Sequence, residues 1–159
     1  MVELTAWTAV LVALRPGREA ALAASLATMG VGLPKVGRFT EAGGLVLVRV
    51  APFQVWAMRA GSDVPLMDEL APLGAEAGLI DQSDSRIGLR LEGATARARL
   101  AHLVPLDLHP TRFGPGQCAQ TLMAHMTVVL LQLADDVYEL LGSRSFSENF
   151  HHAAGSAPA

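Results

Sequence analysis

The sequence has little cysteine and little charge, and each shortage excludes a class of protein. Its 159 residues contain one cysteine, Cys118, which excludes an internal disulfide and a multi-cysteine zinc knuckle. A single free thiol fits a reducing, cytoplasmic setting. The formal net charge is −3 and no Lys/Arg block is present, so we expect neither nucleic acid nor an anionic membrane as a partner.

Long apolar runs and nucleotide-binding glycine loops are missing as well. The apolar stretch at residues 6–14 is far shorter than the roughly 20 residues that cross a bilayer, and the acidic Glu3 stands where a signal peptide carries positive charge. We interpret the stretch as a buried strand. The glycines at 114 and 116 have the spacing of neither a dinucleotide-binding loop nor a phosphate-binding loop.

The sequence is rich in apolar residues. Hydrophobic residues make up 51% of the chain, mean hydropathy is +0.35, and only 17% of residues are charged, against about a quarter in ordinary soluble domains. Two explanations remain open at this point. Either the many alanines inflate the hydrophobic count, or another chain covers part of the surface.

The pattern of apolar residues predicts an α+β fold built from two tandem β-α-β-β units, with helices packed on mixed or antiparallel sheets. We divide the chain into an N-terminal half at residues 1–80, a C-terminal half at 81–155 and a loose tail at 156–159, the two halves forming one intimately packed unit. The expected strands are residues 6–14, 45–50, 53–58, 86–91, 120–125, 127–133 and 137–141, and the expected helices are 18–29, a short one after Pro65, 94–104 and one starting at Ser145 with a capping box to Glu148.

Few residues have the spacing of a catalytic or metal site. Cys118 is either a nucleophile served by His109 or His125, or a small buried hydrophobic residue. The adjacent histidines at 151–152 would point about 100° apart on a helix, and no supported i, i+4 ligand pair occurs, so we expect no metal site. The carboxylates at 135–136 are interpreted as a turn. Arg97 is assigned to the polar side of the helix at 94–104, opposite its apolar residues.

The segment 105–121, PLDLHPTRFGPGQCAQT, is the most unusual part of the chain. Its three prolines and two glycines predict a rigid loop that leads into a strand. The loop is read as an interface with a partner subunit or as the remnant of a ligand site. The residues in question are Pro105, Asp107, His109, Arg112, Phe113, Gln117, Cys118, Gln120 and Thr121.

Three segments carry a resemblance to a known family. They are DQSDSRIGLRLEGATARARL at 81–100, the loop segment at 105–121, and DDVYELLGSRSFSENF at 135–150. Together they resemble the gamma subunit of heterotetrameric sarcosine oxidase, whose fold is that of the folate-binding aminomethyltransferases. The likeness is strong from Asp81 to Phe150 and looser before it.

The resemblance implies a role in an oxidoreductase complex that demethylates sarcosine and passes the one-carbon unit to tetrahydrofolate. It implies an alpha subunit with NAD and tetrahydrofolate, a beta subunit with FAD and covalent FMN, and a delta subunit with zinc. Sister complexes act on other N-methylated amino acids such as N-methylglutamate. Two alternatives remain: the chain is a subunit of one of these sister complexes, or it is a stand-alone folate-binding protein.

One departure from the aminomethyltransferases points to a non-catalytic subunit. In those enzymes a carboxylate near the tip of a hairpin contacts the folate, whereas the hairpin expected here at 121–133 contains no acid. We therefore expect no catalytic residue, no cofactor and no metal on this chain. The loop at 105–121 is expected to lie against or near a partner subunit.

Overall fold

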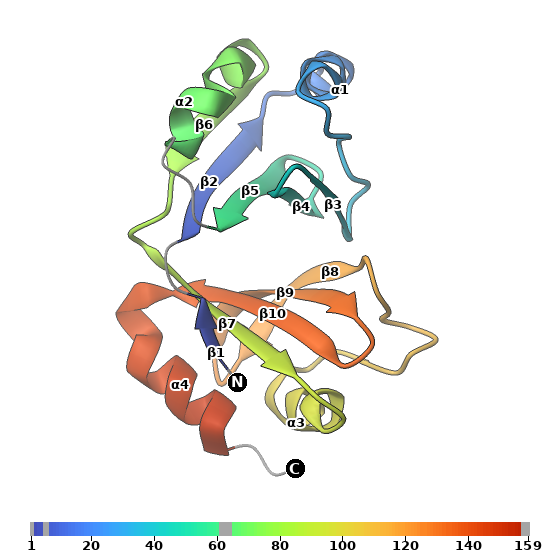
Figure 1. The fold of residues 1–159 in the computed structure, drawn as a ribbon, viewed down its shortest axis with the longest axis vertical. Coiled ribbons are helices and arrows are strands. Elements are labelled where there is room, and N and C mark those ends of the chain that lie inside the picture. Colours follow the sequence, from blue (N-terminus) through green and yellow to red (C-terminus); the bar gives the residue numbers. More distant parts are fainter. Residues whose placement is uncertain (1, 5–6, 61–64, 157–159) are drawn as a thin grey trace. The chain divides into compact units, whose positions relative to one another are not determined.

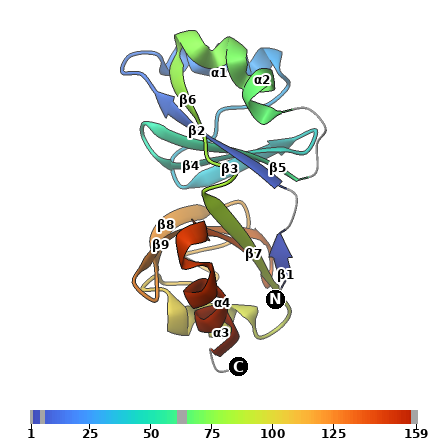
Figure 2. The same cartoon turned by 90° about the vertical axis from the view of Figure 1, so that its left-hand side faces the viewer.

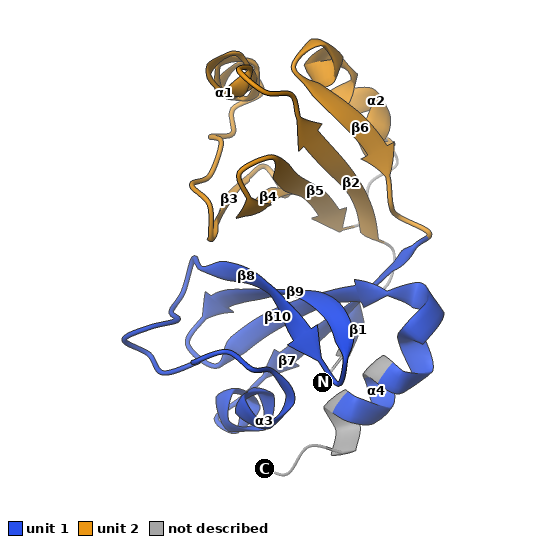
Figure 3. Ribbon diagram, turned by 180° about the vertical axis from the view of Figure 1, so that it is seen from behind, with its two compact units in different colours: residues 1–4, 85–159 blue, residues 5–84 orange. Residues whose placement is uncertain are grey.

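The computed structural model describes residues 2–4, 7–60 and 65–156. It forms two compact units, one of residues 1–4 with 85–159 and one of residues 5–84 (Figure 3). Each unit contains a five-stranded sheet in which every pairing is antiparallel. The predicted α+β class is confirmed. None of the described helices is long and apolar enough to cross a membrane.

In the unit of residues 5–84, one face of the sheet is covered by helices (Figures 1 and 2). The strand order is β3-β4-β5-β2-β6. Alternate residues of β2 (Val10 and Val12) and the buried side of α1 (Leu22 and Leu26) meet in one core, as period-2 and period-3.6 patterns require. The elements are β2 Trp7–Leu14, α1 Glu19–Thr28, β3 Arg38–Ala42, β4 Leu45–Ala51, β5 Gln54–Ala60, α2 Leu66–Leu70, the 3₁₀ turn η1 Ala71–Ala75 and β6 Ala77–Asp81.

The unit of residues 1–4 and 85–159 has the strand order β1-β7-β10-β9-β8. Its core joins Leu89 of β7 and Leu140 of β10 to Leu100 of α3, and Ala153 of α4 belongs to the same cluster. The elements are β1 Val2–Leu4, β7 Arg86–Glu92, α3 Ala96–Leu103, β8 Cys118–Met123, β9 Met126–Ala134, β10 Val137–Ser143, the 3₁₀ turn η2 Arg144–Phe146 and α4 Ser147–Ser156.

Three strands were not expected, and one helix start was placed wrongly. β1, β3 and β6 are edge strands of three to five residues, and sheets specify such strands by pairing more than by their own sequence. The capping box is wrong, because α4 begins at Ser147. Ser145 lies in η2, and its hydroxyl is 2.9 Å from that of Ser143.

Side-chain hydrogen bonds fix the ends of several elements. Arg59 of β5 forms a two-pronged ion pair with Glu69 of α2, one prong measuring 2.9 Å. At the end of β6, the Ser83 amide and hydroxyl donate to Asp81 Oδ1 at 2.9 and 2.7 Å. The Ser83 hydroxyl also accepts from the Ala9 amide at 3.1 Å, so this turn ties β6 to β2.

Candidate functional site

The candidate site is the connection between α3 and β8, where the backbone has no regular structure but is closely hydrogen-bonded. The His109 carbonyl accepts from the amides of Arg112 at 2.8 Å and Phe113 at 2.9 Å. Asp107 Oδ1 accepts from the His109 amide at 2.9 Å, and His109 Nδ1 lies 2.8 Å from the Thr111 hydroxyl. These bonds form an Asx turn followed by a tight bend, so the tip of the loop has one defined conformation.

The second half of the connection is joined to the sheet. The Gln117 side-chain oxygen accepts from the Gly114 amide at 2.6 Å. Gly116 donates to the Gln132 carbonyl at 2.9 Å, and the Gln132 amide donates to the Gln117 carbonyl at 3.0 Å. Two loop residues thus oppose one residue of β9, which is the geometry of a β-bulge at the start of β8.

An arginine of α3 holds the middle of the loop from inside. Arg97 Nη1 donates to the Leu108 carbonyl and, at 3.4 Å, to the Phe113 carbonyl. Its guanidinium carbon lies 5.7 Å from the centre of the Tyr138 ring. With its amide nitrogen facing Phe113, Gln132 donates to that same carbonyl at 3.0 Å and accepts from Arg97 Nη2 at 2.9 Å. We call Arg97, Gln132 and Tyr138 the Arg97 cluster.

The Arg97 cluster was missed by the sequence reasoning. The sequence placed Arg97 on the polar side of the helix but gave it no partner, whereas its guanidinium is turned toward the loop and Tyr138. One signal was present: Gln132 is a polar residue in the apolar strand MTVVLLQLA, and a buried amide needs hydrogen-bond partners. Nothing in the sequence indicated that Arg97 would be one of them.

The charge of Arg97 is balanced by dipoles and an aromatic face. Burial raises the pKa of the Tyr138 phenol, although the Arg97 guanidinium acts in the opposite direction. The phenol is therefore neutral at physiological pH. The electron-rich face of its ring attracts the guanidinium cation. The cluster is suited to fixing the loop in place.

The structure separates the predicted site residues into an inner and an outer group. Phe113 and Cys118 are 5% and 3% exposed, and Gln117 is bound to Gly114. Thr121 is half-buried in β8. The exposed members are Pro105, Asp107, His109, Arg112 and Gln120. The inner group anchors the loop, while the outer group gives it a polar surface with one acid, one histidine and one arginine.

The geometry does not favour thiol chemistry at Cys118. Its side chain is buried, and the Nδ1 atom of the exposed His109 is already 2.8 Å from the Thr111 hydroxyl. His125 lies at the other end of β8, in the turn after Met123. Strand rise puts it roughly 16 Å or more from Cys118 along the strand, far beyond hydrogen-bond reach.

The hairpin of β8 and β9 turns through Ala124 and His125, which have positive φ values of 47° and 70°. As the sequence indicated, neither strand nor turn contains an acid. The acidic pair at 135–136 lies in the following turn, where Asp136 has φ 56°. The predicted Asp–Asp turn is confirmed, and the tip where aminomethyltransferases are expected to carry a carboxylate has none.

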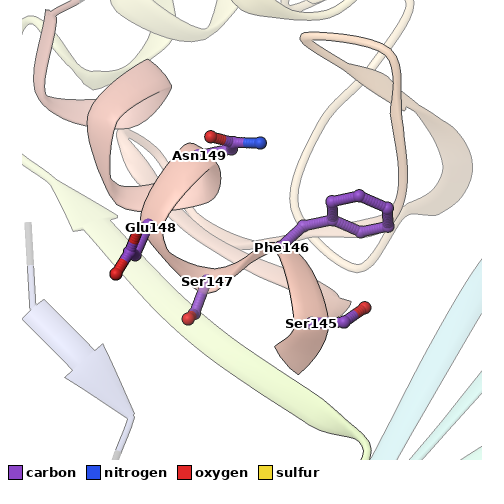
Figure 4. Close-up of a pocket in the computed structure, with 5 residues that line it drawn as sticks. All are labelled: Ser145, Phe146, Ser147, Glu148 and Asn149. Atoms are coloured by element: carbon purple, nitrogen blue, oxygen red, sulfur yellow. The ribbon is translucent and has the colours of Figure 1, made fainter.

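A small hollow of about 240 Å³ lies at the start of α4 (Figure 4). The described residues that line it are five consecutive ones from the end of η2 and the first turn of α4, so no side chains distant in the sequence converge there; they are Ser145, Phe146, Ser147, Glu148 and Asn149. Among the described residues, no three His, Cys, Asp or Glu side chains are grouped closely enough to hold a metal ion.

Comparisons with known proteins agree with this description. A family model described as "Sarcosine oxidase, gamma subunit family" matches residues 17–159. The sarcosine oxidase subunit gamma of Corynebacterium sp. (strain U-96) is 34% identical over 134 residues; the match covers 82% of this chain but only 65% of that relative's length.

Solved structures also resemble nearly the full length of the chain, and two of them illustrate this. A chain of the heterotetrameric sarcosine oxidase from Corynebacterium sp. U-96, in complex with pyrrole 2-carboxylate, matches with TM-score 0.85 and 30% identity, over 98% of this chain and 80% of that one. Aminomethyltransferase T from Bartonella henselae matches with TM-score 0.65 and 15% identity, over 97% of this chain and 44% of that one. The second likeness concerns the fold alone and confirms the predicted aminomethyltransferase-like fold.

Proposed function

Because the chain belongs to the sarcosine oxidase gamma subunit family, we propose that it is the gamma subunit of a multi-subunit oxidoreductase that demethylates sarcosine oxidatively. The one-carbon unit passes to tetrahydrofolate. The complex works in the cytoplasm. This chain has a structural role, and the chemistry takes place on its partners.

The partners in this proposal are alpha, beta and delta subunits. They hold the FAD, FMN, NAD, tetrahydrofolate and zinc of the complex, and the present chain holds none of them. The chain spans 65% of the length of its curated relative. The segments it shares include the loop and the hairpin described above, since the family match runs from residue 17 to residue 159.

The observation that carries the proposal is the division of the loop into an anchored inside and a polar outside. Asp107 and His109 are both used to shape the loop through backbone and hydroxyl contacts. The exposed Arg112 belongs to the same loop, its amide bonded to the His109 carbonyl at 2.8 Å, and Arg97 donates to the carbonyl of the next residue, Phe113. A rigid, exposed polar loop costs little conformational entropy on binding and suits protein docking. We assign it to the contact with a larger subunit.

Co-expression tests the proposal. The tagged chain is produced alone and together with the products of its neighbouring genes, and each preparation is assayed for flavin absorbance and for sarcosine-dependent oxygen consumption. The proposal requires co-purification of flavin-containing subunits and turnover only in the complex. A lone chain that binds tetrahydrofolate tightly, or that oxidises sarcosine by itself, would contradict the proposal.

A further inference from the structure

Every open sheet has edges, and among the residues that the structure describes three of the four edge strands are protected. Edge strands present unpaired backbone groups, which proteins shield by shortness, charge or covering elements. β1 has only three residues, one of them Glu3. β3 carries Arg38 and Glu41. β6 ends in Asp81 and contacts η1 and α2.

The fourth edge, β8, has none of these protections. It is six residues long, with the sequence CAQTLM, and contains no charged residue and no proline. In the described part of the chain it pairs with β9 only (Figure 1). Gln120 is exposed, and Leu122 is 47% exposed, which places it among the few large apolar side chains facing solvent.

The hairpin turn determines which backbone groups of β8 face outward. Met123 and Met126 are paired across a two-residue turn, and both turn residues have positive φ. This is a type I′ turn, in which the closing pair exchanges both hydrogen bonds. Hydrogen-bonded and non-hydrogen-bonded pairs then alternate along the ladder.

Counting back from Met123 assigns the remaining residues. Thr121 and Ala119, opposite Val128 and Leu130, turn their N–H and C=O groups toward β9. Gln120, which lies between them, turns its N–H and C=O away from the sheet, and so does Leu122. Gln120 and Leu122 therefore offer two outward donors and two outward acceptors at every-second-residue spacing, with the apolar side chain of Leu122 beside them.

We propose that this edge of β8 is a strand-addition site, at which an extended, uncharged segment of another subunit of the complex pairs with Gln120 and Leu122. The inference rests on the proposed function. Strand addition takes its affinity from main-chain hydrogen bonds and its specificity from alternate side chains. The partner segment carries an apolar residue opposite Leu122.

Two observations favour another subunit over a second copy of this chain. The similar structure is a heterotetramer, in which other subunits are present to supply the strand. β8 also follows Gln117 directly, so its edge is continuous with the loop assigned above to the same contact. A single partner surface can engage both.

The test replaces Gln120 by proline, which removes only the backbone N–H that faces away from β9. Gln120→Pro removes the outward N–H and leaves the bonds to β9 in place, since edge strands tolerate proline at such positions. Gln120→Ala keeps the N–H and is the matched control. We expect Gln120→Pro to weaken co-purification of the other subunits about threefold to tenfold, and Gln120→Ala to assemble as the wild type does. Normal assembly of Gln120→Pro would overturn the inference.

Hydrogen exchange in the wild-type chain gives an answer that needs no variant. The amides of Gln120 and Leu122 should exchange at least about tenfold more slowly in the complex than in the isolated chain, while Thr121, already bonded to β9, changes little. If the melting temperature of Gln120→Pro is far below that of the wild type, its assembly no longer tests the inference. The hydrogen-exchange measurement then tests it, together with Leu122→Lys, which places a charge on the edge.

The outcomes separate the two proposals. An assembled, active complex in which the amides of Gln120 and Leu122 exchange as fast as in the isolated chain leaves the proposed function intact and overturns the strand-addition site. Protection that appears in the isolated chain as its concentration rises assigns the edge to a second copy and also overturns it. A wild-type chain that fails to co-purify with any subunit overturns both.

Discussion

Arg97 of α3 lies against Tyr138 of β10, with 5.7 Å between the guanidinium carbon and the ring centre. The same guanidinium donates to the carbonyls of Leu108 and Phe113. One side chain thus connects a helix, a strand and the loop assigned to subunit contact. The shape of that loop depends on a residue outside it.

Replacing Arg97 by lysine tests this connection. Lysine keeps the charge but lacks the planar fork that reaches both carbonyls and stacks on the ring. We expect a loss of about 1–3 kcal/mol in the free energy of unfolding, measured by urea denaturation. Arg90→Lys is the control, because the Arg90 side chain is 40% exposed and pairs with the carboxylates of Glu92 and Glu139, which lysine can also reach; its cost should stay below about 0.5 kcal/mol. Equal costs for the two variants would contradict the role given to Arg97.

The two residues in the turn at the end of β8 are unfavourable for its backbone geometry. Ala124 and His125 have φ values of 47° and 70°, where side chains with a Cβ are disfavoured and where Asn-Gly is preferred. The double change Ala124→Asn, His125→Gly should therefore stabilise the chain by about 1 kcal/mol or more, raising the thermal midpoint. A lower midpoint would mean that His125 makes a stabilising contact that outweighs the strain.

Two strand glycines differ in the space around them. A Cβ on Gly88 would meet Leu4 Cδ1 at 3.0 Å and Leu4 Cβ at 3.1 Å, whereas on Gly78 it would meet Ala13 Cβ at an ordinary 3.8 Å. Gly78→Ala should be neutral or slightly stabilising, because it restricts the unfolded chain. Gly88→Ala should be less stable than Gly78→Ala by about 1 kcal/mol, since β1 must shift. Urea denaturation compares the two variants, and equal free energies of unfolding would show that β1 can shift without loss of stability.

The turn after β6 should make stability depend on pH in the acid range. Hydrogen bonds from the Ser83 amide and hydroxyl hold the pKa of Asp81 below its ordinary value of 3.8. Because the folded-state pKa is the lower one, the stabilisation is complete above the unfolded-state value and is lost as pH falls through the folded-state value. Asp81→Asn removes this dependence. The stability difference between the wild type and Asp81→Asn should be constant above about pH 5 and shrink below about pH 4. A difference that is unchanged down to pH 3 would contradict the role of these bonds.

Local pattern predicted the parts of the fold in which the sequence alternates clearly. The run Arg86–Leu91 has period 2 and forms β7, and the Leu22–Leu26 spacing forms the buried side of α1. The edge strand β3, with the sequence RFTEA, has too little apolar alternation to be recognised. Its conformation comes from pairing with β4, which is a tertiary effect.

The sequence predicted the loop at 105–121 but not the contacts that hold it in place. The prolines, Asp107 and the glycines predicted a rigid loop, and the Asx turn that Asp107 forms with the His109 amide agrees with that. The contact of Arg97 with Phe113 joins residues 16 positions apart across a bend. No periodicity encodes such a contact, because the bend that creates it depends on the packing of the whole unit.

The central claim is that the loop serves assembly and not chemistry, and charge reversal at its tip tests this most directly. Arg112→Glu reverses the exposed cation of the loop, and Arg18→Glu, at an exposed arginine just before α1, is the matched control. The measurement is sarcosine turnover per bound flavin in the purified complex, together with the yield of that complex. The account predicts a lower yield for Arg112→Glu with unchanged turnover per flavin, and wild-type values for Arg18→Glu. A full yield of complex with turnover lost in Arg112→Glu would contradict it.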